Sequence, residues 1–115
     1  MNAADAVQAL DFACHRALKV PKDDMSRVML LEALAGLEAT PLDSFPEQVL
    51  DLVERSREQA DALSDRILAS NSLSDPSIDR EIRAVCRTLA SLAAAMRAPS
   101  GVNAAEGAQS PERPA

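Results

Sequence analysis

Aromatic residues are nearly absent from this chain of 115 residues, which has no tryptophan, no tyrosine and two phenylalanines. A core with so few aromatic rings must be built mainly from Leu, Ile, Val and Ala, and it offers little on which a flat ligand can stack. The chain also has only one histidine, two cysteines and three glycines. These numbers argue against a metal site, a catalytic nucleophile–base arrangement and a glycine-rich phosphate loop. We therefore expect a non-enzymatic protein with no cofactor.

Long apolar runs and excess positive charge are missing as well. The formal net charge of −6 disfavours binding to nucleic acid and to anionic membranes. No run is long enough to span a membrane, and the first residues lack the basic and apolar regions of a signal peptide. A cytoplasmic location is expected, with Cys14 and Cys86 reduced and acting as small apolar residues.

Four segments repeat apolar residues at helical spacing, and stretches containing proline separate them. They predict helices at about residues 3–19, 25–39, 45–70 and 76–97. Asp23 or Asp24 is a suitable N-cap for the second helix. The spacing of Ser44 and Glu47 predicts a capping box at the start of the third. Asp75 followed by proline predicts the start of the fourth.

The third and fourth segments carry apolar seams that step by four and three residues, as in a heptad repeat. Joined by a short turn, they predict an antiparallel hairpin that the first two helices cover. The expected fold is all-α, a four-helix bundle over residues 1–98 or a hairpin that dimerises into one. Residues 99–115 contain almost nothing large and apolar, which predicts a disordered tail. The seams are Val49, Val53, Ser56, Ala60, Leu63 and Ile67, and Ile78, Ile82, Val85, Leu89, Leu92 and Met96.

Acidic residues follow the outer side of the third helix with the same regular steps as its apolar seam. Like charges one turn apart destabilise a helix by about 0.2–0.5 kcal/mol per pair. Two opposite-charge pairs, Asp51–Arg55 and Arg57–Asp61, are expected to offset part of this cost. The row is either a solvated face or a docking surface for a basic partner. We call it the acidic ladder: Glu47, Asp51, Glu54, Glu58, Asp61 and Asp65.

Three arginines of the fourth helix, Arg80, Arg83 and Arg87, are expected on its outer side, where Asp79 is placed to pair with Arg83. We call them the arginine stripe. Both rows are predicted to face away from the hairpin's own interface, so they would pair between two copies and support a homo-oligomer. Phe12 is predicted outside its helix's apolar seam. The second helix is apolar almost all round, which indicates a central position or a shared interface.

A short segment of the first helix, His15-Arg16-Ala17-Leu18-Lys19, resembles the phosphoacceptor segment of histidine-phosphotransfer domains, which are also four-helix bundles. That family places its lysine three residues after the histidine and then a glycine. Here Lys19 stands four residues after His15, and Val20 follows it. No functional residue is transferred from that family.

The function expected from the sequence is binding to another protein that has a basic surface, as an adaptor, an inhibitor or a chaperone-like module, in a chain that forms a homo-oligomer. The acidic ladder would be the docking face. The alternative is a regulator that touches nucleic acid through the arginine stripe, and a more remote one is phosphotransfer through His15.

Overall fold

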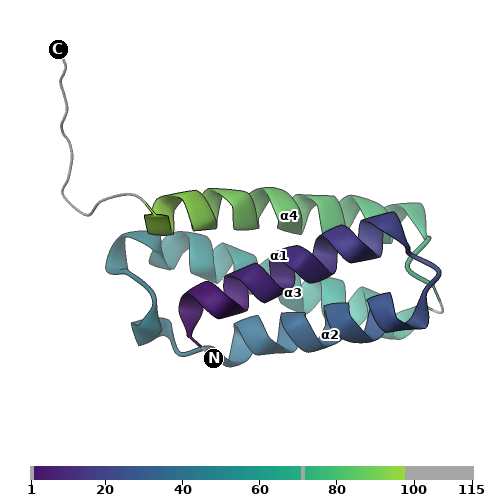
Figure 1. Cartoon of the computed structure of the whole chain (residues 1–115), viewed down its shortest axis with the longest axis horizontal. Helices are drawn as coiled ribbons and strands as arrows, with labels where there is room; N and C mark the ends of the chain where they lie inside the picture. Colours follow the sequence, from purple (N-terminus) through teal and green to yellow (C-terminus); the bar gives the residue numbers. More distant parts are fainter. Residues whose placement is uncertain (1, 71, 98–115) are drawn as a thin grey trace, which may run out of the picture.

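The computed structural model describes residues 2–70 and 72–97, which form one helical bundle (Figure 1). The helices are α1 (Ala3–Lys19), α2 (Asp24–Ala39), α3 (Leu50–Ala69) and α4 (Pro76–Arg97). Two short 3₁₀ turns, η1 (Leu42–Ser44) and η2 (Glu47–Val49), connect α2 to α3. The predicted tail, residues 99–115, lies outside the described residues.

Consecutive helices pack against each other, and α4 closes the bundle by packing against α1. Short connections reverse the chain after each helix, so neighbouring helices run antiparallel (Figure 1). The predicted all-α bundle with an α3–α4 hairpin is therefore confirmed, with α1 and α2 covering the hairpin's open side.

The core consists of the predicted seams. All six α3-side positions and five of the six α4 positions are buried, while Met96 packs at the edge. On α1, the buried residues include Ala3, Val7, Leu10, Cys14 and Ala17, which step by four and three residues along one face. Two residues outside the helices, Phe45 and Leu73, are also buried in the same core. Burial of aliphatic side chains from all four helices is thus the main stabilising contribution to the fold.

Aspartates mark the beginning of two helices, as the sequence predicts. The Asp23 side chain accepts a hydrogen bond of 3.2 Å from the backbone N–H of Met25. Asp75 accepts one of 2.8 Å from the backbone N–H of Ser77. Each carboxylate satisfies a backbone donor that has no partner within its helix.

The predicted start of the third helix is wrong by several residues. Its regular part begins at Leu50, after η2, and the capping box does not form. The Ser44 hydroxyl instead donates a 2.6 Å hydrogen bond to the carbonyl of Pro41 within η1. A serine hydroxyl can bond to a backbone group of a local turn as readily as to a free N–H at the start of a helix. Here the hydroxyl bonds within the turn.

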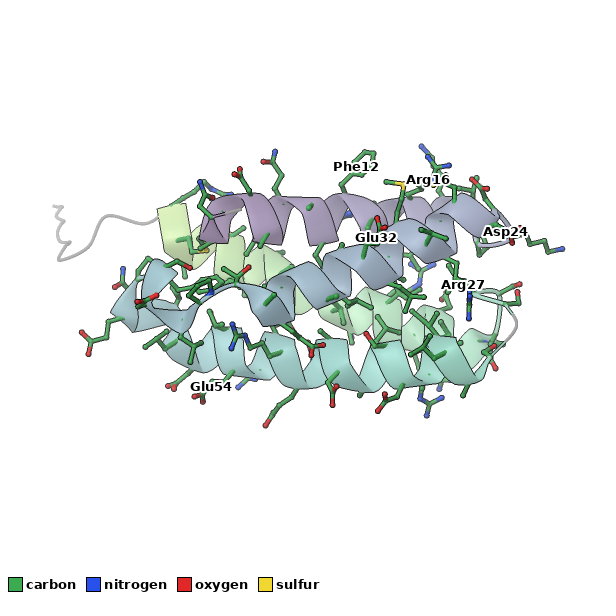
Figure 2. All side chains as sticks on the ribbon, turned by 90° about the horizontal axis from the view of Figure 1, so that it is seen from below. Phe12, Arg16, Asp24, Arg27, Glu32 and Glu54 are labelled. Carbon is green, nitrogen blue, oxygen red and sulfur yellow. The ribbon has the colours of Figure 1, made fainter. Side chains whose placement is uncertain are left out.

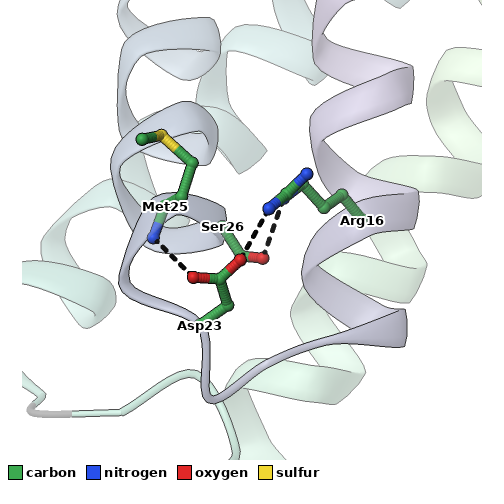
Figure 3. A network of polar contacts seen from close by, with 4 residues as sticks. All are labelled: Arg16, Asp23, Met25 and Ser26. Atoms are coloured by element: carbon green, nitrogen blue, oxygen red, sulfur yellow. Dashed lines mark hydrogen bonds and ion pairs between the residues drawn. The ribbon is translucent and has the colours of Figure 1, made fainter.

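Arginines join the helix ends. At the α1–α2 turn, Arg16 contacts Asp23 at 2.6 Å and donates to the buried Ser26 hydroxyl at 3.2 Å (Figure 3). The Arg16 guanidinium, together with the Met25 N–H, lowers the pKa of Asp23. At the α3–α4 turn, Arg66 donates to the Ser77 hydroxyl. One cation therefore bridges each of these turns.

The α2–α3 pair has a reciprocal arrangement. Arg27, near the beginning of α2, donates to the carbonyls of Ile67 and Ser70 at the end of α3, at 3.0 and 3.4 Å. Arg57, in the first half of α3, donates to the carbonyl of Thr40 at the end of α2. Cations are favourable at helix C-termini, where the last carbonyls lack partners, so each helix stabilises the end of the other.

Candidate functional site

The acidic ladder lies on η2 and α3, and all six of its residues are exposed. Figure 2 shows Glu54 projecting away from the body of the bundle, on the side of α3 opposite to α1. Within residues 2–70 and 72–97, none of the six carboxylates forms an ion pair. The ladder is therefore an anionic surface that the described contacts of the fold do not neutralise.

The two pairs expected to offset the ladder do not form in the described part of the chain. Neither Asp51–Arg55 nor Arg57–Asp61 is among its ion pairs. The guanidinium of Arg57 turns instead to the α2 C-terminus. A half-buried guanidinium gains more from a carbonyl acceptor than an exposed pair gains on a helix surface.

A further acid, Glu38 of α2, extends this negative region beyond α3, and the sequence analysis missed it. Partial burial and the nearby carboxylates of Asp61 and Asp65 raise the pKa of Glu38, while Arg57 lowers it. Its proximity to α3 depends on how α2 packs, which the spacing of acids along α3 alone could not show. The negative surface thus spans the α2–α3 boundary.

The arginine stripe is exposed, and Arg83 pairs with Asp79 at 2.9 Å as predicted. Arg80 and Arg87 line a groove of about 440 Å³ between α3 and α4, beside Arg66. Glu58 lines an adjoining groove of about 290 Å³ between the same helices.

Glu58, Arg80 and Arg87 are exposed, as expected, and they also border these open grooves between α3 and α4. Long side chains can extend along the surface from the side on which they leave their helix.

Phe12 is 60 % exposed on α1, as predicted. It points outward on the side of the bundle opposite to Glu54 (Figure 2). The structure therefore does not bring Phe12 and the acidic ladder together. Helix α2 is not central: it buries one face and leaves Met25 and Val28 about half exposed. Its excess apolar surface faces solvent, and the shared interface that its sequence indicated stays a prediction.

A third groove, of about 700 Å³, lies between α1 and α4. His15 and Asp11 line it together with apolar residues such as Leu89 and Ala93. The ring of His15 is exposed and bonds through Nδ1 to the Asp11 carbonyl at 2.8 Å. This bond and the Asp11 carboxylate raise the pKa of His15. Near this groove, the thiols of Cys14 and Cys86 lie close enough to shift each other's pKa, a proximity that the sequence analysis missed.

Among the described residues, no group of three or more His, Cys, Asp or Glu side chains is arranged to hold a metal ion. No helix in this part of the chain is both long and apolar enough to cross a membrane. Comparison with protein-family models, curated proteins and solved structures finds no match for the chain.

Proposed function

We propose that this protein is a non-enzymatic binding module that docks a basic surface of another protein on its acidic ladder. The observation that carries the proposal is that six exposed carboxylates follow one side of η2 and α3 without an ion pair among the described residues. Their spacing costs helix stability, which a purely solvated face would not require. A basic partner would remove that repulsion on binding.

The distribution of arginines supports the same proposal. Arg16, Arg27, Arg57 and Arg66 contact the ends of neighbouring helices rather than the ladder. The cations that the fold uses are therefore committed elsewhere. The ladder is left available for cations from outside the described bundle, and these would be lysine or arginine side chains on a partner.

Self-association is the second part of the proposal. A second copy would offer Arg80, Arg83 and Arg87 as cations for the ladder. Exposed Phe12 lies on a different side and would contribute a separate apolar contact. We place the module in the cytoplasm, in line with its acidic charge and its two free cysteines.

The test reverses two rungs of the ladder, Glu54→Arg and Glu58→Arg, in the full chain. Stability should hold or rise by about a few tenths of a kcal/mol, because like charges are removed from an exposed helix face. Affinity capture from the native cell, quantified by mass spectrometry, should lose the partner that the parent protein captures. Capture by the parent protein should weaken between about 0.05 and 0.5 M salt, because exposed charges are screened.

The matched control changes the same amount of charge elsewhere, with Glu32→Arg and Asp43→Arg at two exposed positions outside the ladder. This variant should keep the partner. If the double reversal captures the same proteins as the control, without salt dependence, the ladder is a solubility feature and the proposal is wrong.

Light scattering after gel filtration of the same variants tests the self-association part. The parent protein should run as a dimer or larger at micromolar concentration, and the ladder reversal should shift it to a monomer. Phe12→Ser should weaken association and leave the melting temperature unchanged, because this side chain is exposed. A monomeric parent protein would eliminate self-association while leaving the capture experiment unaffected.

A further inference from the structure

The two cysteines of the chain are far apart in sequence, yet the packing of α1 against α4 brings them to the same level of the bundle. The groove between these antiparallel helices is lined by Asp11 and His15 of α1 and by Leu89 of α4. Cys14 lies next to His15, and Cys86 lies one turn before Leu89, so both cysteines are near this groove. Cys14 is buried in the core and Cys86 packs against the same core, and the two thiols lie close enough that each shifts the pKa of the other.

Two small residues of α1, Ala13 and Ala17, lie beside Cys14 on the buried face of this helix. Small neighbours favour the close approach that a disulfide needs, with Cα atoms about 4.4–6.8 Å apart.

We propose that Cys14 and Cys86 form a reversible redox pair in which a small-molecule disulfide, such as oxidised glutathione, converts the two thiols into a disulfide between α1 and α4. The product covalently joins the first and last helices of the bundle. The pair lies on the α1–α4 side, so it is separate from the acidic ladder of α3.

The two sulfurs have different roles because their surroundings differ. Cys14 is fully buried, whereas Cys86 is partly exposed. The neighbouring Cys14 thiol, with His15 and Arg83 nearby, lowers the pKa of Cys86 to about 7, although burial and Asp11 act in the opposite direction. The neighbouring Cys86 thiol and burial raise the pKa of Cys14. The accessible thiolate is the nucleophile in disulfide exchange, so Cys86 reacts first.

The reaction then proceeds in two exchanges. The Cys86 thiolate attacks one sulfur of oxidised glutathione, forming a mixed disulfide and releasing one glutathione thiolate. The Cys14 sulfur, losing its proton to the released thiolate, then attacks the Cys86 sulfur and displaces the second glutathione thiolate. In sum, two protein thiols lose two electrons and two protons, and one glutathione disulfide becomes two thiols.

The experiment incubates the folded full-length protein with excess oxidised glutathione, followed by acid quenching, unfolding and alkylation of any remaining thiols. Intact mass spectrometry should show the loss of two hydrogen atoms and no alkylation. Trypsin cleaves after Arg16, Arg83 and Arg87, so residues 1–16 should be recovered joined to residues 84–87. Dithiothreitol should separate these two peptides.

Single variants test the order of attack. With Cys14→Ala, Cys86 should accumulate as a stable glutathione adduct. With Cys86→Ala, the buried Cys14 should remain unmodified, and circular dichroism checks that both variants fold. The proposed redox pair is refuted by any of three results: the parent protein keeps two alkylatable thiols, it stops at a glutathione adduct, or it forms disulfides only between chains. The result for the parent protein decides the question even if a variant does not fold.

Discussion

Arg27 offers a direct test of how the α2–α3 pair is stabilised. Replacing it by methionine keeps most of the aliphatic side chain but removes hydrogen bonds of 3.0 and 3.4 Å to the carbonyls of Ile67 and Ser70. A hydrogen bond from a charged donor contributes about 1.5–3 kcal/mol, and the longer bond here contributes less than the shorter one. A cation at a helix C-terminus adds about 0.3–1 kcal/mol.

Together these contributions predict that Arg27→Met lowers the free energy of unfolding by about 2–3 kcal/mol. With a urea m-value of about 1–2 kcal/mol/M, the unfolding midpoint should fall by about 1–3 M. Urea denaturation followed by far-ultraviolet circular dichroism measures the shift. Arg27→Lys should recover only part of the loss, because both bonds leave the terminal nitrogen Nη2 of the guanidinium, and the shorter lysine side chain does not place its ammonium group at the same position.

Arg80→Met is the matched control, because Arg80 is exposed and has no hydrogen-bond partner among the described residues. Its free energy of unfolding should change by less than about 0.5 kcal/mol. Arg57→Met should also destabilise, and because Arg57 acts at the other end of the pair, its effect should add to that of Arg27→Met within about 0.5 kcal/mol. Equal midpoints for Arg27→Met and Arg80→Met would refute the stabilising role of this contact.

Three further predictions follow from burial, charge and the extent of the core. Leu63→Ala should destabilise by about 2–5 kcal/mol, whereas the same change at Leu68, which is 65 % exposed, should cost less than about 0.5 kcal/mol; similar losses would show that the α3 seam is misassigned. The single histidine allows its pKa to be followed by NMR: it should exceed the ordinary value, and Asp11→Asn should reduce it. Since the folded-state pKa is raised, this contact stabilises at pH below the unfolded-state pKa, and the contribution is lost as pH rises through the folded-state value; an unshifted pKa would contradict the contact. Deleting residues 99–115 should leave the melting temperature unchanged, because the hydrophobic core of the described residues forms without them. A fall of several degrees would contradict this prediction.

Much of the fold was predictable because it is encoded within single helices. The steps from Val53 to Ile67 and from Ile78 to Leu92 identify the buried faces without any tertiary information. Asp23 and Asp75 mark helix starts because a carboxylate acts on backbone donors only two residues away. The exposure of the acidic ladder was predictable for the same reason, since opposite sides of one helix are determined by the residue spacing.

The contacts between segments were decided only by the tertiary structure. Arg57 had a suitable partner in Asp61 along its own helix, yet it bonds to Thr40 of α2. Cys14 and Cys86 lie close together because of the packing of α1 against α4, and Glu38 joins the acidic region because of the packing of α2.

The physical reason is the distance along the chain over which each signal acts. Periodicity and capping act within one or two turns of the chain, so the sequence by itself determined the helices, their buried faces and the position of the ladder. A long side chain has several possible acceptors of similar strength, and the acceptor to which it bonds depends on which helix ends lie within reach. Only the packed bundle therefore decided the arginine partners, the grooves between helices and the pairing of the two thiols.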